Sequence, residues 1–354
     1  MVSVCKVVAK MPQAERTTMD VTEYFKCLLY TAPSFDVDIC LARNEDFNFG
    51  LDTVKGLFFE KGRFLEKEVS IPPIIDNTWF LPETMRKSLK GKHIMRRRFG
   101  FSKSEQYEIV NEINSLRHLL IPTLPIEKVD DIHRALNDFG GEIIVKPVDG
   151  LKGSDIWRIV AADKLRIQSN DSIFEYHSQD EFNRFCESKF VQNYIAQAFV
   201  KSQTVEGHPF DIRIHVIRTG KEQFYVEPFV RTGGRQKITS NIHTGGAALP
   251  AEWFLEEHFG KEISKQILNE ITWIGKTLAP FYQQHLRFLM IDLGIDIGVE
   301  VKNDTFELKL FEINAYPGYI IPGKLGRVLN VTVASMEAYH YVHQFMTDSS
   351  KRFW

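Results

Sequence analysis

The sequence predicts an α+β protein built from two or three packed lobes. Strand-like alternation and helix-like periodicity occupy separate segments, and 354 residues with 44% apolar side chains can bury a sizeable core. Helices are expected at residues 22–30, 103–119, 129–139, 178–188, 254–284 and 328–346.

Residues 1–98 are expected to form a small α/β lobe at the N-terminal end. Strands are predicted at 2–9, 37–42 and 57–59, and a proline-rich connection follows. The basic run RKSLKGKHIMRRR, residues 86–98, closes this segment. Two interpretations of the run are open: a solvated surface, or a binding site for an anionic substrate.

Charge and cysteine usage argue against several classes of protein. A formal net charge of −2 supplies no electrostatic attraction to nucleic acid. The four cysteines form no CxxC pair and no metal-ligand spacing, which is typical of reduced thiols in a cytosolic protein. No signal-peptide pattern and no run of about 18 apolar residues occurs. A cytoplasmic protein that does not bind membranes is therefore expected.

The most informative stretch is a pair of segments near the C-terminus, FLMIDLGIDIGVEV at 288–301 and FELKLFEINAYPG at 306–318. From residue 291 to 301, every odd position is apolar and every even position is polar or glycine. This alternation predicts a strand with one face in contact with water.

The second segment carries Glu312 and Asn314, whose side chains should leave the same face of a strand. A hairpin turn at 303–304 would make paired residue numbers add up to about 607, and we therefore expect Asp292 to lie beside Asn314 and Ala315. Two carboxylates and an amide oxygen form the hard oxygen cluster that Mg²⁺ prefers.

The alternative for these carboxylates is an ordinary solvated strand. Asp292 and Glu312, taken singly, fit that alternative, and only their convergence favours a metal site. Asp296 and Glu300 lie on the same polar face and are expected to be solvated, with Asp296 as a reserve ligand.

A phosphate-binding segment is predicted between residues 102 and 154. Ser102 is a plausible N-cap for a helix that Lys103 opens. Lys146 ends the buried strand IIVKP, and the glycine turn at 150–154 follows, whose backbone N–H groups could approach phosphate oxygens. An ordinary hairpin loop with glycines would look similar.

Two arginines and one loop complete the candidate site. In the strand PFDIRIHVIR, Arg213 shares a face with Asp211, and the next strand reaches Arg231. Planar guanidinium groups suit a phosphoryl group or a carboxylate, although Arg213 could instead form an ion pair with Asp211 or a neighbour. His243, in the loop after Arg231, could bind substrate or only brace the loop.

From about residue 100 to the C-terminus, these motifs occur in an order that resembles the ATP-grasp superfamily. Three of them, PFDIRIHV, SNIHTGG and IDLGID, resemble its YheC/YheD-like branch, which is named after endospore coat-associated proteins. The resemblance implies a nucleotide held between two antiparallel sheets. The implied subdomains are residues 99–200, with the phosphate loop, and 201–354, with the metal site.

The resemblance also implies roles for individual residues. Lys103 and Lys146 would contact the α- and β-phosphates, and the 150–154 loop would close over the β- and γ-phosphates. Gln197 would meet the adenine amino group. The implied ATP-binding residues are Lys103, Lys146, Gly150, Lys152, Gly153, Ser154, Gln197, Phe199, Val200 and Asn241; the implied Mg²⁺ ligands are Asp292, Glu312 and Asn314; the implied catalytic residues are Arg213, Arg231 and His243.

The sequence departs from the family pattern at three positions. Asp155 stands where the phosphate loop often has a further glycine, which should stiffen the loop. Gln197 replaces a common glutamate, but its carbonyl can still accept a hydrogen bond from adenine. Met290 replaces the glycine that usually precedes Ile-Asp, which should alter packing and not ligation.

The function that the resemblance implies is an ATP-dependent carboxylate–amine (or thiol) ligase that uses an acylphosphate intermediate. Its substrates would be a small-molecule, peptide or carrier-bound carboxylate and an amine, and a homodimer is a reasonable expectation from the family. Two alternatives share the motifs: a nucleotide-binding structural or regulatory protein, spore-associated by analogy with the branch name, and an ATP-dependent kinase.

Overall fold

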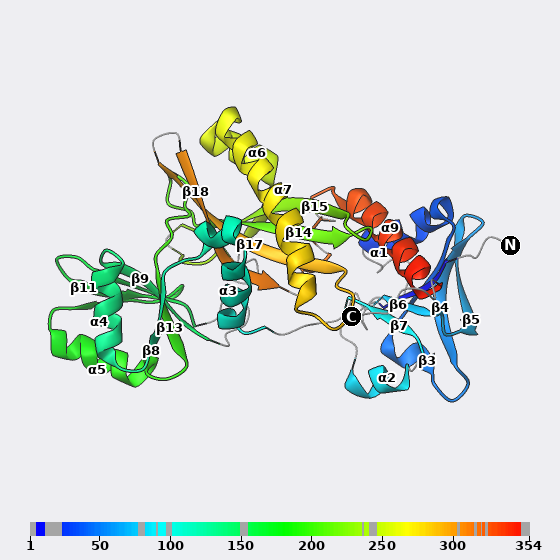
Figure 1. Cartoon of the computed structure of the whole chain (residues 1–354), viewed down its shortest axis with the longest axis horizontal. Helices are drawn as coiled ribbons and strands as arrows, with labels where there is room; N and C mark the ends of the chain where they lie inside the picture. The colour runs from blue at the N-terminus through cyan, green and yellow to red at the C-terminus, as the bar shows by residue number, and fades with distance from the viewer. Residues whose placement is uncertain are drawn as a thin grey trace.

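Three β-sheets lie in a row along the long axis of the molecule in the computed structural model (Figure 1). The structure describes residues 5–10, 23–76, 82–89, 91–96, 101–148, 155–235, 237–240, 246–302, 305–314, 317–319, 321–322 and 325–347. The sheet near the N-terminus is mixed, and the other two are antiparallel. Helices and strands occupy separate parts of the chain, as the sequence predicts for an α+β protein.

The N-terminal sheet has the strand order β3-β4-β2-β1-β6-β7, with β5 beside β4. Its strands are β1 (Cys5–Lys10), β2 (Val37–Ala42), β3 (Phe47–Asn48), β4 (Thr53–Glu60), β5 (Arg63–Ser70), β6 (Ile74–Asp76) and β7 (His93–Met95). The helices of this lobe are α1 (Glu23–Thr31), η1 (Ala32–Phe35), η2 (Asn44–Asp46) and α2 (Glu83–Ser88). The expected N-terminal α/β lobe is confirmed.

The sheet at the opposite end, called the small sheet here, has the order β12-β11-β10-β9-β13-β8. Its strands are β8 (Thr123–Ile126), β9 (Glu142–Pro147), β10 (Trp157–Ala161), β11 (Leu165–Gln168), β12 (Ile173–Tyr176) and β13 (Tyr194–Ala198). Helices α4 (Val129–Asp138) and α5 (Gln179–Phe190) pack on one face, where Phe182 and Phe190 contact the core side of the strands. These two helices do not cover the other face of the small sheet.

The central sheet has the order β16-β15-β14-β17-β18. Its strands are β14 (Phe210–Arg218), β15 (Phe224–Thr232), β16 (Ala247–Pro250), β17 (Asp292–Lys302) and β18 (Thr305–Asn314). The helix expected at 254–284 is two helices, α6 (Ala251–Phe259) and α7 (Lys261–Gln284), because Gly260 breaks it with a φ of +79°. Both helices pack on one face of this sheet, as Figure 1 shows. None of the described helices has both the length and the apolar character needed to cross a membrane.

The hydrophobic cores cross the expected domain boundaries. Helix α3 (Lys103–Glu112) and η3 (Asn114–Leu119) bury Ile109 and Leu116 in the core of the central sheet, although they precede the small sheet in sequence. Helix α9 (Val328–Thr347) packs beside α1 on the N-terminal sheet, although it ends the described chain. The expected divisions after residues 98 and 200 therefore do not coincide with the edges of the cores.

The packing of α7 on the central sheet can be tested with two substitutions in that helix. Ile271 is fully buried, so Ile271→Ala should lower the free energy of unfolding by about 2–5 kcal/mol, because it leaves a cavity. Lys265 is exposed on the same helix, and Lys265→Ala should change it by less than about 0.5 kcal/mol. Chemical denaturation followed by circular dichroism measures both values, and equal effects would contradict the packing described.

Candidate functional site

Lysine and glutamine side chains lie on the face of the small sheet that points away from its helices. Strands β9 and β13 pair with Lys146 opposite Ile195 and Gln197 opposite Ile144. Because side chains alternate along a strand, these four side chains share one face, while Ile143, Val145 and Ala196 fill the core on the other.

Lys103 reaches the same end of the small sheet from helix α3. Its Nζ donates to the carbonyl oxygen of Pro147 at 3.1 Å, and its helix begins with a capping box between Ser102 and Glu105. The N-cap predicted at Ser102 is confirmed. Two lysines from different elements therefore meet at the end of β9.

The environment of Lys146 is unfavourable for its charge. Burial and the nearby charge of Lys103 lower the pKa of Lys146 to about 7, and only the carboxylate of Glu312 opposes this shift. No hydrogen bond to the ammonium group occurs among the described residues. An anion such as a polyphosphate would relieve the repulsion between the two lysines.

Gln197 lies at the other end of the same face and is oriented by its neighbours. Its amide nitrogen donates to the hydroxyls of Tyr107 (2.8 Å) and Thr123 (2.9 Å). Both donors are therefore engaged, and the carbonyl oxygen is the group that can accept a further hydrogen bond. Tyr107, which orients this amide, carries no sequence signal that could have identified it.

The segment after Gln197 offers one backbone hydrogen-bond donor and one backbone acceptor. The N–H of Phe199 donates to Glu142, and the carbonyl of Val200 accepts from Ser202. Among the described residues, the carbonyl of Phe199 and the N–H of Val200 make no such bond. An adenine edge needs this pair of one acceptor and one donor.

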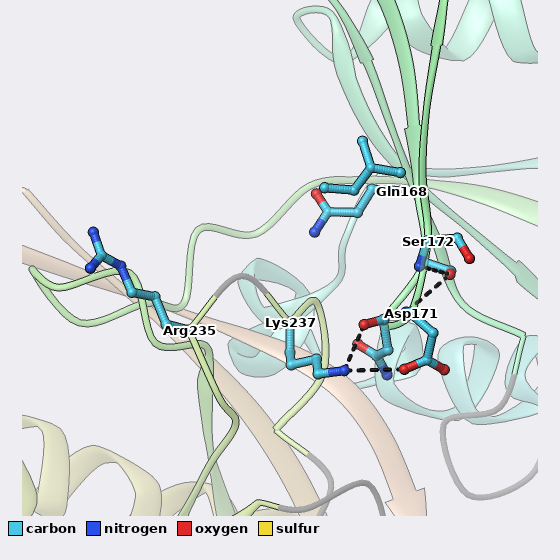
Figure 2. A pocket seen from close by; sticks show the side chains of 8 residues that line it. Gln168, Asp171, Ser172, Arg235 and Lys237 are labelled. Atoms are coloured by element: carbon cyan, nitrogen blue, oxygen red, sulfur yellow. Dashed lines mark hydrogen bonds and ion pairs between the residues drawn. The ribbon is translucent and has the colours of Figure 1, made fainter.

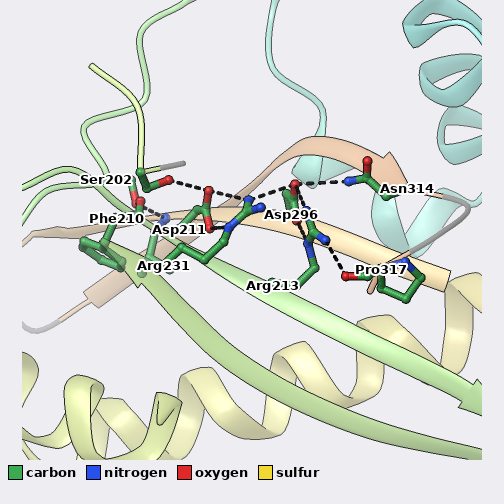
Figure 3. Close-up of polar contacts among 10 residues, drawn as sticks. Ser202, Phe210, Asp211, Arg213, Arg231, Asp296, Asn314 and Pro317 are labelled. Carbon is green, nitrogen blue, oxygen red and sulfur yellow. Dashed lines mark hydrogen bonds and ion pairs between the residues drawn. The ribbon is translucent and has the colours of Figure 1, made fainter. Parts of the chain in front are cut away.

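On the central sheet, a row of alternating charges crosses three strands (Figure 3). Arg231 donates to both oxygens of Asp211 at 2.7 Å, and these residues face each other across β14 and β15. Arg213 makes a bidentate pair with Asp296, directly opposite it on β17, and Arg231 also lies 2.9 Å from Asp296. The partner of Arg213 is therefore Asp296, and not Asp211.

Asp296 is the centre of this row. It is 4% exposed, and burial alone would raise its pKa, but the charges of Arg213 and Arg231 outweigh that effect and lower the pKa. The amide nitrogen of Asn314 donates to the same carboxylate at 3.2 Å. Asp296 is thus a buried, ionised group and not the solvated residue expected from the sequence.

A bulge in the β17–β18 hairpin places Glu312 opposite Asp296. From Ile297 to Lys302, the numbers of paired residues add up to 607, as expected. Beyond that point the register shifts by one residue, so that Asp296 pairs with Glu312 and Gly294 with Asn314. Phe311 is the extra residue, and Gly298 accommodates its ring, because a Cβ there would lie 2.3 Å from Phe311 Cζ. The bulge moves Glu312 and Asn314 to the face that carries Asp296.

The expected convergence of Asp292 with Glu312 and Asn314 is wrong. Asp292 lies four residues from Asp296 along β17, a separation of roughly 13 Å. It accepts hydrogen bonds from Arg96 and Tyr319 in a fully buried cluster beside the N-terminal sheet. Arg96 itself belongs to the basic run, so neither a solvated surface nor an anion site describes that residue.

The carboxylate of Glu312 lies beside charges of both signs. Burial raises its pKa, and the charge of Asp296 raises it further, whereas Lys103 of α3, Lys146 of β9 and Arg213 act in the opposite direction. Among the described residues, Glu312 makes no hydrogen bond. A cation beside Glu312 and Asp296 would remove the repulsion between them.

The donor set at this position fits Mg²⁺ better than a softer metal. Two carboxylates and the amide of Asn314 offer hard oxygen atoms, and an incomplete set leaves places for water and phosphate. Within the described residues, no group of three His, Cys, Asp or Glu side chains could hold a metal ion. The cluster therefore has two protein carboxylates only.

Several expected site residues cannot be placed. Gly150, Lys152, Gly153, Ser154, Asn241 and His243 lie outside the described residues. The expectation for the phosphate loop and for the loop after Arg231 therefore stays a prediction.

A second link joins the small sheet to the central sheet at the β11–β12 turn (Figure 2). Lys237 Nζ donates to the Asn170 carbonyl at 2.7 Å and lies 3.1 Å from Asp171. The side-chain oxygen of Asn170 accepts from the backbone of Ile238 and Thr239. The pocket beside this link is lined by none of the expected site residues.

The site lies between two antiparallel sheets. One side presents lysines and the amide of Gln197, and the other presents buried carboxylates. This arrangement defines a protein of the ATP-grasp class. The chain belongs to the family described as YheC/D like ATP-grasp, which matches residues 92–336. The resemblance inferred from the sequence and the expected ATP-grasp fold are both confirmed.

Individual relatives are distant. The chain is 22% identical over 271 residues to the endospore coat-associated protein YheC of Bacillus subtilis (strain 168), and the match covers 72% of each protein. Its fold is similar to that of the ATP-grasp ligase PsnB complexed with minimal precursor, with a TM-score of 0.50, 11% identity, and coverage of 95% of this chain and 99% of that one. D-cycloserine synthetase DcsG matches with a TM-score of 0.48, 11% identity, and coverage of 94% and 99%.

The shifted pKa of Lys146 can be measured directly. After reductive ¹³C-methylation, one lysine signal should titrate near pH 7, and the variant Lys146→Arg should lack it. Glu312→Gln should lower this pKa further, because it removes the one carboxylate that favours the charged form. An NMR titration in which Glu312→Gln leaves the Lys146 signal unchanged would contradict the proximity of the two side chains.

Proposed function

We propose that this protein is an ATP- and Mg²⁺-dependent ligase that joins a carboxylate to an amine or a thiol through an acylphosphate. The observation that carries the proposal is the approach of Lys103 and Lys146, from one side, to Glu312, from the other. Lysines and carboxylates that approach one another from separate elements match a polyphosphate with a bound divalent ion.

The adenine would lie at the Gln197 end and the phosphates at the Lys146 end of the small sheet. The free carbonyl of Gln197 supports recognition of the adenine amino group, and the backbone groups of Phe199 and Val200 support recognition of the ring edge. Lys103 and Lys146 would hold phosphate oxygens. The loop containing Gly150, Lys152, Gly153 and Ser154, together with Asn241, is proposed to close over the phosphates.

Asp296, Glu312 and Asn314 would hold Mg²⁺, and a bound Mg²⁺ would neutralise charge on the transferring phosphoryl group. This assignment replaces Asp292 with Asp296. Glu312 supports it most directly, because among the described residues its carboxylate lies close to Asp296 and to the positive charges of Lys103, Lys146 and Arg213.

Arg213 and Arg231 are proposed to bind the acceptor carboxylate and the acylphosphate. Both guanidinium groups already lie beside Asp296, so they are next to the proposed phosphate position without rearrangement of the sheet. In the first step the carboxylate attacks the γ-phosphorus and ADP leaves; in the second, the nucleophile attacks the acyl carbon and phosphate leaves. Positioning and charge neutralisation account for most catalysis in phosphoryl transfer.

A second candidate function is nucleotide binding in a structural protein without turnover. The observation in its favour is the name of the Bacillus subtilis relative, an endospore coat-associated protein. ADP release with panels of acids, amines and hydroxylamine separates the candidates, because hydroxylamine converts an acylphosphate into a hydroxamate that mass spectrometry detects. Binding of MgATP without ADP release from any panel would favour the structural candidate.

Glu312→Gln tests the metal site with the smallest change in shape. Because Glu312 makes no hydrogen bond among the described residues, the variant should fold normally, but ADP formation should fall roughly 100-fold and lose its dependence on Mg²⁺ concentration. Glu307→Gln on the same strand is the matched control, because that side chain is exposed. Unchanged ADP formation in Glu312→Gln would refute the assignment.

A further inference from the structure

Residues 317–319, called the cover segment here, follow the β17–β18 hairpin and touch two networks of charged residues. One network is the charge row centred on Asp296. The other is the buried cluster around Arg96 beside the N-terminal sheet. The cover segment lies between them, over Gly294 of β17.

At its first residue the cover segment contacts the proposed catalytic row. The carbonyl oxygen of Pro317 accepts a hydrogen bond from Arg213 Nη1 at 3.3 Å, as Figure 3 shows. Gly294 allows this approach, because a Cβ there would lie 3.0 Å from Pro317 Cβ and 3.5 Å from Arg213 Cδ. The guanidinium of Arg213 is thus held by Asp296 on one side and by Pro317 on the other.

At its last residue the cover segment is anchored to the N-terminal lobe. The Tyr319 hydroxyl donates to Asp292 and lies 2.6 Å from Arg96 Nε, and all three side chains are 5% exposed or less. Arg96 also donates to Asp76 of β6 and to Ser335 of helix α9. Between the two anchors, Gly318 turns the chain with a φ of +76°, a conformation that favours glycine.

The ring of Tyr319 adds an apolar contact to this anchor. It packs against the ring of Tyr24 at 4.6 Å and against His215, two residues after Arg213 on β14, at 4.9 Å. The aromatic contacts remain when the hydroxyl is removed, so the role of the hydroxyl can be tested separately.

We propose that Tyr319 is a positioning residue for Arg213. The buried Arg96–Asp292 pair holds Tyr319, and the cover segment in turn fixes the position of the Arg213 guanidinium group. The proposal rests on the function proposed above, in which Arg213 contacts the transferring phosphoryl group or the acceptor. It assigns a role to the Arg96 cluster: the N-terminal lobe, by holding Tyr319, determines where the guanidinium group lies.

A purely structural role for the cluster makes a different prediction. In that case every hydroxyl that binds the buried charges should matter only for stability. Tyr339 supplies the matched comparison, because it is fully buried on α9 and its hydroxyl donates to Asp76 in the same network and not to Asp292.

The experiment compares Tyr319→Phe with Tyr339→Phe in the full chain. The Arg213 Nε–H signal in an arginine-selective ¹⁵N NMR spectrum, identified by its loss in Arg213→Lys, should shift in Tyr319→Phe and stay in place in Tyr339→Phe. Trapping of MgADP with aluminium fluoride, an analogue of the transferring phosphoryl group, should weaken about tenfold in Tyr319→Phe only, with MgADP affinity unchanged.

Equal behaviour of the two variants in both measurements would overturn the proposal. Wild-type protein that binds no MgADP would contradict the proposed function, while the Arg213 signal would still decide the role of Tyr319. If Tyr319→Phe does not fold, Ser335→Ala supplies a second test: it removes the hydroxyl that Arg96 Nη2 donates to at 3.0 Å, so the Arg96–Tyr319 anchor should loosen and the Arg213 signal should shift. An unshifted signal in that variant would also overturn the proposal.

Discussion

The pairing of Asp296 with two arginines is the interaction on which the arrangement of the candidate site depends. One buried carboxylate accepts from Arg213 on its neighbouring strand and from Arg231 one strand further. Burying these charges is favourable only because each has a close opposite partner. The row therefore fixes the order and spacing of three strands at the position where the phosphates of a nucleotide would lie.

The two faces of the cleft differ in how well their charges are balanced. The row on the central sheet is nearly neutral, since Asp211 and Asp296 match Arg213 and Arg231. Lys103 and Lys146 repel each other at the end of β9, and Glu312 lies opposite Asp296 without a hydrogen bond among the described residues. A magnesium-bound polyphosphate has the charges that would satisfy both groups, which is why the geometry favours a nucleotide.

The N-terminal lobe and the central sheet are joined by burial of charge as well as by apolar packing. Arg96 is the largest fully buried side chain, and its partners Asp76 and Asp292 come from β6 and β17. Helix α9 closes the same region by packing on the N-terminal sheet. Because an unpaired buried charge is costly, a displacement of the lobe from the central sheet would be opposed strongly.

Local patterns in the sequence were sufficient to predict the α+β class, the alternating strand at 291–301, the Ser102 cap and the family, because each of these depends on residues close together in the chain. Local sequence patterns could not decide whether Asp292 or Asp296 lies beside Glu312 and Asn314. The outcome depends on a single bulged residue, Phe311, which fits only because Gly298 lies across the hairpin, and a shift of one residue moves side chains to the opposite face. The burial of Arg96 is equally non-local, since its partner Asp292 is 196 residues away and only the folded chain brings them together.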